Sequence, residues 1–334
     1  MKVLFLSGVP CSLAHGGAQV VADKLMEYLP TIGVEAEPLR WWDGDQRGDI
    51  LHHIGRPPTM LVDLAHGKGM KCVMTQFLDQ TSNRSRNGLL LRRVALVLSQ
   101  KTGAILGRPH DTGVYRKFDA MVFVNRHEWG VAKYLYGAHP DRGHTIGHGL
   151  DAEALSALAA PSAPVEIPYL VSAATIVARK NSVRLAECAL EAKVPVHFLG
   201  KPLSETDPYF RRFMERVDGK YVVFRGFVSE EEKQRALRDA RGFALLSEYE
   251  SGCIAVYEAA AAGLPLFLSD LPWARKHYPE SPRIEYVDPA SPDVPTRLGR
   301  FFETHGREKD QTFPVPSWQD VAGQYKKIYE SILA

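Results

Sequence analysis

The chain has 334 residues, which exceeds one typical domain and predicts two domains of about 150 residues each. A formal net charge of only +2 argues against nucleic acid as the main partner. The four cysteines lack the paired spacing of a zinc site or a disulfide framework, which favours a reduced, cytoplasmic compartment. The N-terminal apolar run is too short for a signal peptide, and no stretch approaches about 18 apolar residues. We therefore expect a protein that is soluble or peripheral to a membrane.

The first predicted element is a buried strand over residues 2–7, followed by a glycine-bearing loop and an amphipathic helix that runs to Tyr28. This order is typical of the opening of a doubly wound α/β domain. Gly16 and Gly17 in the loop permit close backbone approach, so they serve either as a turn device or as a support for a phosphate or sugar. The G-x-G-x-x-G fingerprint is absent, which counts against a dehydrogenase.

Further strands are predicted at residues 49–54, 71–75 and 120–124, with helical stretches between them. His52 and His53, near the end of the first of these strands, have two readings. They are acid/base groups, or they are histidines packed in the sheet. No carboxylate or further histidine stands at ligand spacing, so metal binding by this pair is disfavoured.

Residues 81–117 are strongly basic, with eight lysines and arginines against the single Asp111. Apolar residues alternate with arginines between positions 89 and 98, which predicts a basic amphipathic helix. One interpretation is peripheral contact of residues 84–117 with a membrane or an anionic acceptor. The other is a helix that covers the sheet and shows its charges to water. We favour the second, because the helix has no evident aromatic anchor.

A proline-bearing linker over residues 159–164 leads to the second half of the chain. Strands are predicted there at residues 169–173, 194–199 and 221–224, and a helix ends at Ala192. The second domain is therefore another α/β sheet. The chain ends in an amphipathic helix that begins after a serine cap at Ser317.

The most informative stretch, residues 242–269, reads strand, loop, helix, strand. The helix should begin near Gly252 and end at Gly263, a glycine suited to a left-handed cap. The backbone N–H groups of Gly252, Cys253 and Ile254 at the helix start would attract an anion, phosphate above all.

Two carboxylates flank this helix start. Glu250 lies in the preceding loop and Glu258 about two turns into the helix. Carboxylates that met a phosphate directly would repel it, so we expect them to accept hydrogen bonds from hydroxyl groups attached to that phosphate. A phosphate between two polyols is the layout of a nucleotide sugar.

The stretch from Glu250 to Pro265 resembles the E-x7-E and A-x-x-G-x-P signature of the retaining, family-four glycosyltransferases of the GT-B fold, also called glycosyl transferases group 1. The resemblance implies that Glu250 contacts the transferred sugar and that the helix start at Gly252, Cys253 and Ile254 binds the diphosphate. It also implies that Glu258 binds the ribose. The sequence His15-Gly16-Gly17 is similar to the family loop that approaches the donor.

Lys180 matches a family lysine that neutralises the diphosphate as the sugar bond breaks, a task that a cation performs well. Three positions depart from the family pattern. Thr175 stands where the family has an arginine, and Arg179 is a candidate substitute because guanidinium binds phosphate well. Gln76 with its neighbour Phe77 replaces a histidine that approaches the sugar, and His148 replaces an asparagine.

The resemblance implies an α/β GT-B protein made of two Rossmann-like doubly wound parallel-sheet domains with an interdomain cleft. We expect an acceptor-side domain at 1–160, a nucleotide-sugar-binding domain at 165–312, and a C-terminal helix at 313–334 that crosses back to the first domain. The implied reaction moves a sugar from a nucleoside diphosphate to a hydroxyl acceptor, with retention and without a metal or other cofactor. Two alternatives stay open: a GT-B epimerase, and a degenerate glycosyltransferase that only binds a nucleotide or a partner, which would explain Thr175 and Gln76.

Overall fold

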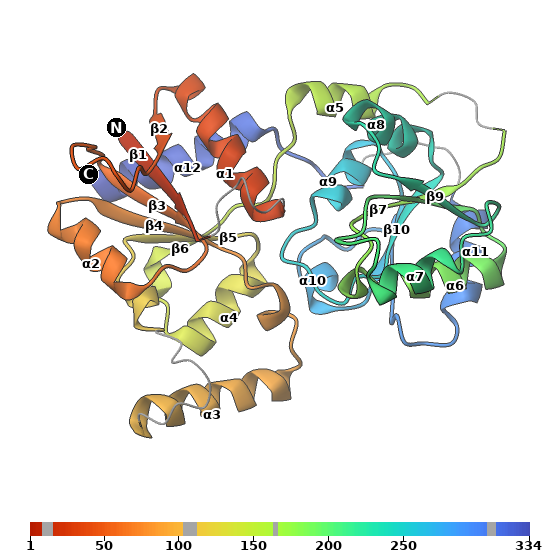
Figure 1. Ribbon diagram of the computed structural model, residues 1–334, viewed down its shortest axis with the longest axis horizontal. Helices are drawn as coiled ribbons and strands as arrows, with labels where there is room; N and C mark the ends of the chain where they lie inside the picture. The colour runs from red at the N-terminus through yellow and green to blue at the C-terminus, as the bar shows by residue number, and fades with distance from the viewer. Residues whose placement is uncertain (9–15, 103–111, 163–165, 306–311) are drawn as a thin grey trace. The chain divides into compact units, whose positions relative to one another are not determined.

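The computed structural model describes residues 1–8, 16–102, 112–162, 166–305 and 312–334 (Figure 1). Cys11, His15, Arg108, Asp111 and the linker residues 163 and 164 lie outside these ranges. The chain divides into two compact units. Unit 1 comprises Met1–Gly149 with Pro316–Ala334, and unit 2 comprises Leu150–Val315.

Unit 1 is built on a parallel sheet whose described strands run in the order β2-β1-β3-β4-β5-β6. These strands are β1 (Lys2–Ser7), β2 (Glu35–Pro38), β3 (Ile50–Ile54), β4 (Lys71–Gln76), β5 (Ala120–Phe123) and β6 (Gly143–Thr145). The α-helices are α1 (Gly17–Tyr28), α2 (Thr59–Gly67), α3 (Arg86–Thr102), α4 (Arg126–Tyr136) and α12 (Trp318–Leu333). Short 3-10 helices lie at Pro30–Ile32, Asp79–Thr81, Gly113–Arg116 and Pro140–Arg142.

Both faces of this sheet are buried, because successive strand residues point to opposite sides and both sets are apolar. Helices α1 and α12 pack on one face, and α2 and α4 pack on the other. The C-terminal helix α12 starts with a capping box between Ser317 and Asp320. Although it is last in the chain, α12 is thus part of unit 1.

Unit 2 has a second parallel sheet, with its described strands in the order β12-β11-β10-β7-β8-β9. The strands are β7 (Leu170–Ala173), β8 (Val196–Leu199), β9 (Val222–Gly226), β10 (Gly242–Leu245), β11 (Leu266–Ser269) and β12 (Ile284–Val287). The α-helices are α5 (Ala152–Ala159), α6 (Ser182–Ala192), α7 (Pro208–Met214), α8 (Glu230–Asp239), α9 (Ile254–Ala261), α10 (Pro272–Arg275) and α11 (Val294–Thr304), and a 3-10 helix lies at Ala178–Lys180.

In unit 2, helices α5, α8, α9 and α10 pack on one face of the sheet, and α6, α7 and α11 pack on the other. The predicted pair of doubly wound parallel sheets is therefore confirmed. One close approach shapes the edge where β7 and β8 end. Gly200 has a left-handed φ of +142°, and a Cβ added there would lie 2.0 Å from the Ala174 carbonyl oxygen. Only glycine fits this crossing of two loops.

Candidate functional site

The strand order of unit 2 has a switch point between β7 and β10. From β7 the chain winds outward through β8 and β9, and from β10 it winds the other way through β11 and β12. In open α/β sheets, ligands bind beyond the carboxyl ends of the strands at such a point. The loop after β7 carries Lys180 and the loop after β10 carries Glu250, so both residues lie where this fold binds its ligands.

The loop after β7 is folded tightly around Lys180. The 3-10 helix Ala178–Lys180 ends at Asn181, which has a left-handed φ of 55°. Asparagine tolerates this conformation better than most residues. The Arg179 carbonyl accepts a hydrogen bond from the Glu248 backbone N–H at 2.8 Å. The loops after β7 and β10 are thus joined through their backbones.

Lys180, Arg179 and Glu250 form an ionic cluster at this point. Lys180 Nζ lies 2.6 Å from Glu250 Oε1, and Arg179 Nη1 lies 3.2 Å from each carboxylate oxygen. The side chains of Lys180 and Glu250 are each 9% exposed. Two cations against one carboxylate leave a positive excess at a partly desolvated position, which attracts an anion. The structure brings these three predicted residues together and pairs them with one another, a pairing that the sequence did not indicate.

Helix α9 begins slightly later than predicted. Cys253 is its N-cap residue with an extended backbone, and Ile254 is the first helical residue. The Cys253 N–H donates to the Tyr278 hydroxyl at 3.4 Å. The first turn has no acidic side chain and no side-chain cap, and its donors begin at Ile254. Beyond the helix, Gly263 has the predicted left-handed conformation with φ of +68°.

Glu258, on α9, forms an ion pair that sequence reasoning missed. Its Oε1 lies 2.7 Å from Lys233 Nζ, and Lys233 also lies 2.8 Å from Glu230 at the start of α8. The Glu258 side chain is 13% exposed. Burial raises the pKa of Glu258 above its ordinary value, and Lys233 opposes that rise. No local motif could reveal this pair, because Lys233 and Glu258 belong to different helices.

The loops after β8 and β9 meet in unit 2. Lys201 Nζ lies 5.2 Å from the ring centre of Phe227, whose side chain is largely exposed. An exposed aromatic ring at the carboxyl edge of a sheet offers a face on which a nucleobase can stack. The loops after β8 and β9 are therefore in contact at this edge.

Gly16 and Gly17 lie at the start of α1 in unit 1. The order β2-β1-β3 places the switch point of this sheet between β1 and β3, and the chain reaches these glycines after β1. Gly16 is the N-cap of α1 with extended backbone, and both glycines are exposed. A Cβ added at either would meet no described atom within 4 Å. The surrounding protein therefore leaves room at both positions.

The two histidines of β3 are packed in the sheet. His52 is fully buried, and its ring nitrogens lie 2.7 Å from the Tyr329 hydroxyl and 2.8 Å from the Thr75 hydroxyl. Burial lowers the pKa of His52 to about 3. His53 Nδ1 lies 2.8 Å from the Gly55 carbonyl oxygen, and burial lowers its pKa as well. Both contacts fit a structural role rather than acid/base chemistry.

The surroundings of the three positions that depart from the family pattern are as follows. His148 is buried, with its ring 6.4 Å from that of Phe77 and 6.5 Å from that of Trp318. Gln76 donates to the Phe77 carbonyl, and its buried Oε1 has no hydrogen-bond partner among the described residues. Thr175 carries no charge, so the guanidinium beside Glu250 is that of Arg179.

Helix α3 carries an apolar stripe that faces solvent. Its exposed side chains are Leu90, Leu91, Val94, Val97 and Leu98. They recur every three or four residues and so share one face. Leu89 and Leu96 pack toward the core of unit 1, and α3 runs along α4 (Figure 1). Arg84, Arg86 and Arg93 are exposed as well, so charged and apolar side chains of this segment both face solvent. Among the helices that the structure describes, none combines the length and the apolar character that crossing a bilayer requires.

Solved structures similar to the whole chain share its two-sheet architecture. A glycosyltransferase from Rickettsia africae has a TM-score of 0.71 and 12% identity, over 99% of this chain and 98% of that one. Sucrose-phosphate synthase from Thermosynechococcus elongatus has a TM-score of 0.68 and 15% identity, over 100% and 99%. Anabaena HepE, solved with UDP and glucose, has a TM-score of 0.62 and 14% identity, over 100% and 98%. At these identities the likeness shows a common GT-B fold.

A family model identifies the sequence of unit 2 more specifically. Residues 166–277 match the model of the glycosyl transferases group 1, and this segment contains Lys180, Glu250 and Glu258. A search of curated proteins by sequence found no match. Residues 166–277 are thus similar in sequence to the glycosyl transferases group 1, and the whole chain shares the GT-B fold of the solved structures.

Proposed function

We propose that the protein is a retaining, metal-independent glycosyltransferase that moves a sugar from a nucleoside-diphosphate sugar to a hydroxyl acceptor. The observation that supports this most is the cluster of Lys180, Arg179 and Glu250 at the switch point of unit 2. A sugar diphosphate presents an anion next to hydroxyl groups. This cluster offers two cations for the diphosphate and a carboxylate for the sugar hydroxyl groups. Anabaena HepE was solved with UDP and glucose, which agrees with a donor of this class.

The cluster would change partners when the donor binds. A diphosphate that takes Lys180 and Arg179 as counter-ions frees the Glu250 carboxylate to accept a hydrogen bond from a sugar hydroxyl. N–H groups of the first turn of α9, beginning with Ile254, add donors to the same anion. Gly252 and Cys253, which directly precede this turn, would also contact the donor. Charge that grows on the leaving diphosphate is then met by fixed cations, which lowers the barrier.

The reaction would proceed on one face of the sugar. The acceptor oxygen forms a bond to the anomeric carbon as the bond from that carbon to the diphosphate oxygen breaks. The acceptor proton passes to the departing phosphate, which gives a glycoside and a nucleoside diphosphate. In this proposal Glu250 orients the sugar and does not act as a covalent nucleophile.

The remaining proposed contacts are those with the nucleoside part of the donor and with the acceptor. Glu258 would accept hydrogen bonds from the ribose hydroxyls, and Gly16 and Gly17 would allow the donor to approach unit 1. Unit 1 would bind the acceptor. In this proposal unit 1 takes the acceptor role predicted for residues 1–160, and unit 2, which includes residues 150–160, takes the donor role predicted for residues 165–312.

Two alternatives make different predictions. A GT-B epimerase would turn over a nucleotide sugar with no acceptor present. A degenerate transferase would bind a nucleotide or a partner without any turnover. The ionic cluster favours the transferase, because Arg179 supplies a guanidinium close to Glu250 although Thr175 does not.

Calorimetric titration with UDP, GDP and ADP tests the proposal at its first step. We expect one of the three to bind in the absence of added metal, with affinity reduced in Lys180→Met. Nucleotide sugars that carry the bound base are then incubated with the protein and followed by mass spectrometry, without and with panels of hydroxyl acceptors. Failure of all three nucleotides to bind at high protein concentration would contradict the transferase and the epimerase alike. Turnover without acceptor would favour the epimerase.

A second observation supports a peripheral location at an anionic membrane. The apolar stripe of α3 is flanked by exposed arginines, among them Arg84, Arg86 and Arg93. An amphipathic helix of this kind inserts its apolar face among lipids while its cations meet acidic head groups. Charge complementarity therefore selects an anionic bilayer as the occupant of this face. We propose that the protein is cytoplasmic and binds such a membrane through α3.

Replacing Leu91 by glutamate should lower binding to vesicles of phosphatidylcholine and phosphatidylglycerol by about tenfold. The substitution removes an apolar side chain that would insert into the bilayer, and it adds a negative charge that the anionic head groups repel. Co-sedimentation of protein with vesicles measures this. Leu203→Glu is the matched control, because Leu203 is 82% exposed in unit 2 and should behave as wild type. Wild-type protein that ignores anionic vesicles, or that dimerises through this face in size-exclusion chromatography, would overturn the membrane proposal.

A further inference from the structure

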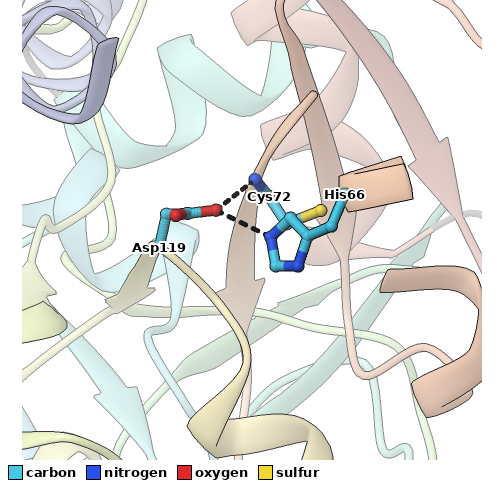
Figure 2. Close-up of side chains that lie close together, drawn as sticks. All are labelled: His66, Cys72 and Asp119. Carbon is cyan, nitrogen blue, oxygen red and sulfur yellow. Dashed lines mark hydrogen bonds and ion pairs between the residues drawn. The ribbon is translucent and has the colours of Figure 1, made fainter. Parts of the chain in front are cut away.

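Three possible metal ligands from separate elements meet at one edge of the sheet in unit 1. His66 lies in the last turn of α2, Cys72 is the second residue of β4, and Asp119 immediately precedes β5. Figure 2 shows the three residues close together, with the Asp119 carboxylate facing the His66 ring and the Cys72 backbone nitrogen. One ligand atom from each residue lies within 4.8 Å of the other two. We propose that His66, Cys72 and Asp119 form a binding site for Zn²⁺ or a similar transition-metal ion.

The spacing of these atoms suits a single ion. His66 Nε2 lies 3.0 Å from Asp119 Oδ2. Two ligands that each bind a tetrahedral zinc at about 2.0 Å lie about 3.3 Å apart. The Cys72 Sγ lies within 4.8 Å of both atoms and would have to move closer to complete three corners of such a site. The Cys72 backbone N–H donates to the same Asp119 oxygen at 2.8 Å, which holds the carboxylate in position.

The chemistry of the ligand set selects the class of ion. Thiolate and imidazole ligands favour zinc and related transition metals, whereas magnesium and calcium prefer oxygen ligands alone. Cys72 is fully buried, while the side chains of His66 and Asp119 are 36% and 21% exposed. An ion can therefore enter from the side of His66 and Asp119, and a water molecule can occupy its fourth position.

The place of the site in the fold argues for a structural ion. Cys72 and Asp119 lie at the amino ends of β4 and β5, whereas ligands of open α/β sheets bind at the carboxyl ends. An ion there would tie the end of α2 to two neighbouring strands. It would not take part in sugar transfer, so this inference stands apart from the proposed function.

Two groups oppose metal binding: the thiol proton of Cys72 and the ammonium group of Lys71. Burial raises the pKa of Cys72 to about 12, and the nearby carboxylates of Asp119 and Asp63 add to this. Formation of the sulfur–metal bond breaks the S–H bond and releases its proton to solvent. Lys71 Nζ lies 3.7 Å from the other oxygen of Asp119, and this 45% exposed side chain can turn toward water.

Cobalt titration of the chelator-treated full chain tests the site directly. We expect one equivalent of Co²⁺ to give a tetrahedral spectrum with a sulfur-to-cobalt charge-transfer band. Cys72→Ser should abolish that band, and His66→Ala should weaken Co²⁺ affinity by at least about tenfold. Zn²⁺ should raise the melting temperature of the wild type and leave that of Cys72→Ser unchanged.

Cys188→Ser is the matched control. Cys188 is fully buried in α6 of unit 2, and burial raises its pKa as well. This variant should keep both the band and the response to Zn²⁺. His66 is partly exposed, so His66→Ala gives a second reading if Cys72→Ser folds poorly. The proposal is overturned if the wild type shows no thiolate band with excess Co²⁺. It is equally overturned if the band persists in Cys72→Ser.

Discussion

Replacing Lys180 by methionine is expected to lower kcat for sugar transfer by about 100- to 1,000-fold, the loss that follows removal of one donor from a preorganised anion-stabilising site. Lys180 Nζ is the most buried cation of the ionic cluster, and it lies 2.6 Å from Glu250. Its charge gains most value as negative charge grows on the leaving diphosphate, so kcat should fall more than donor affinity. Initial rates at saturating donor and acceptor measure the effect.

Two comparisons separate this role from folding and from general charge. Arg179→Met should lose less activity, because the Arg179 side chain is 39% exposed. Lys220→Met is the control, since Lys220 is exposed and lies at the amino end of β9, at the opposite edge of the sheet from the cluster. In Lys180→Met, Glu250 can still pair with Arg179. The melting temperature of each variant shows whether the loss of activity comes from unfolding. A Lys180→Met protein with wild-type kcat would refute the assignment.

Glu250→Ala tests the carboxylate of the same cluster. It should also chiefly slow transfer, because the group that orients the sugar is lost while the diphosphate cations remain. Nucleoside diphosphate alone should bind this variant at least as tightly as the wild type, since Lys180 and Arg179 are released from their ion pairs. Calorimetry with the nucleotide identified above measures this, and weaker binding would contradict the proposed exchange of partners.

The central strands were predictable, whereas β9 was the one edge strand among those described that the sequence predicted. Strands such as β1, β4 and β7 lie inside their sheets and read as continuous apolar runs, because helices cover both of their sides. Strand β2 (Glu35–Pro38) pairs only with β1 and has no buried residue, so its sequence carries no apolar run. Strands β6 and β12 also lie at sheet edges and were not predicted. Edge pairing depends on the neighbouring strand, which local sequence does not describe.

The site residues also fall into those that the local sequence groups and those that only the folded sheet brings together. Glu250, Glu258 and the helix between them form a local pattern, so their grouping could be predicted from the sequence. The ion pair of Lys180 with Glu250 joins loops that follow different strands, and it exists because β7 and β10 are neighbours in the sheet. Helix α3 shows a related limit. Its periodicity predicts an amphipathic helix, but only packing against α4 shows which face is left exposed.

Glu258→Ala is expected to weaken nucleotide binding and to raise the donor KM by about 10- to 100-fold, with little change in kcat. A carboxylate that accepts hydrogen bonds from the ribose contributes about 1.5–3 kcal/mol, and it does so equally in the ground state and the transition state. Calorimetry with the nucleotide and initial-rate kinetics measure the two constants. A large fall in kcat at unchanged KM would place Glu258 in the chemical step instead.

Replacing Lys233 by methionine should change the pH at which nucleotide binding is lost. Burial raises the pKa of Glu258, and Lys233, 2.7 Å away, limits that rise while Glu230 adds to it. In Lys233→Met the carboxylate takes up its proton at a higher pH, so nucleotide binding should be lost at a higher pH on acidification. Lys233→Arg should restore the wild-type profile, and Glu230→Gln should move it little. Coincident profiles of dissociation constant against pH for Lys233→Met and wild type would rule out an ionised Glu258 as the ribose ligand.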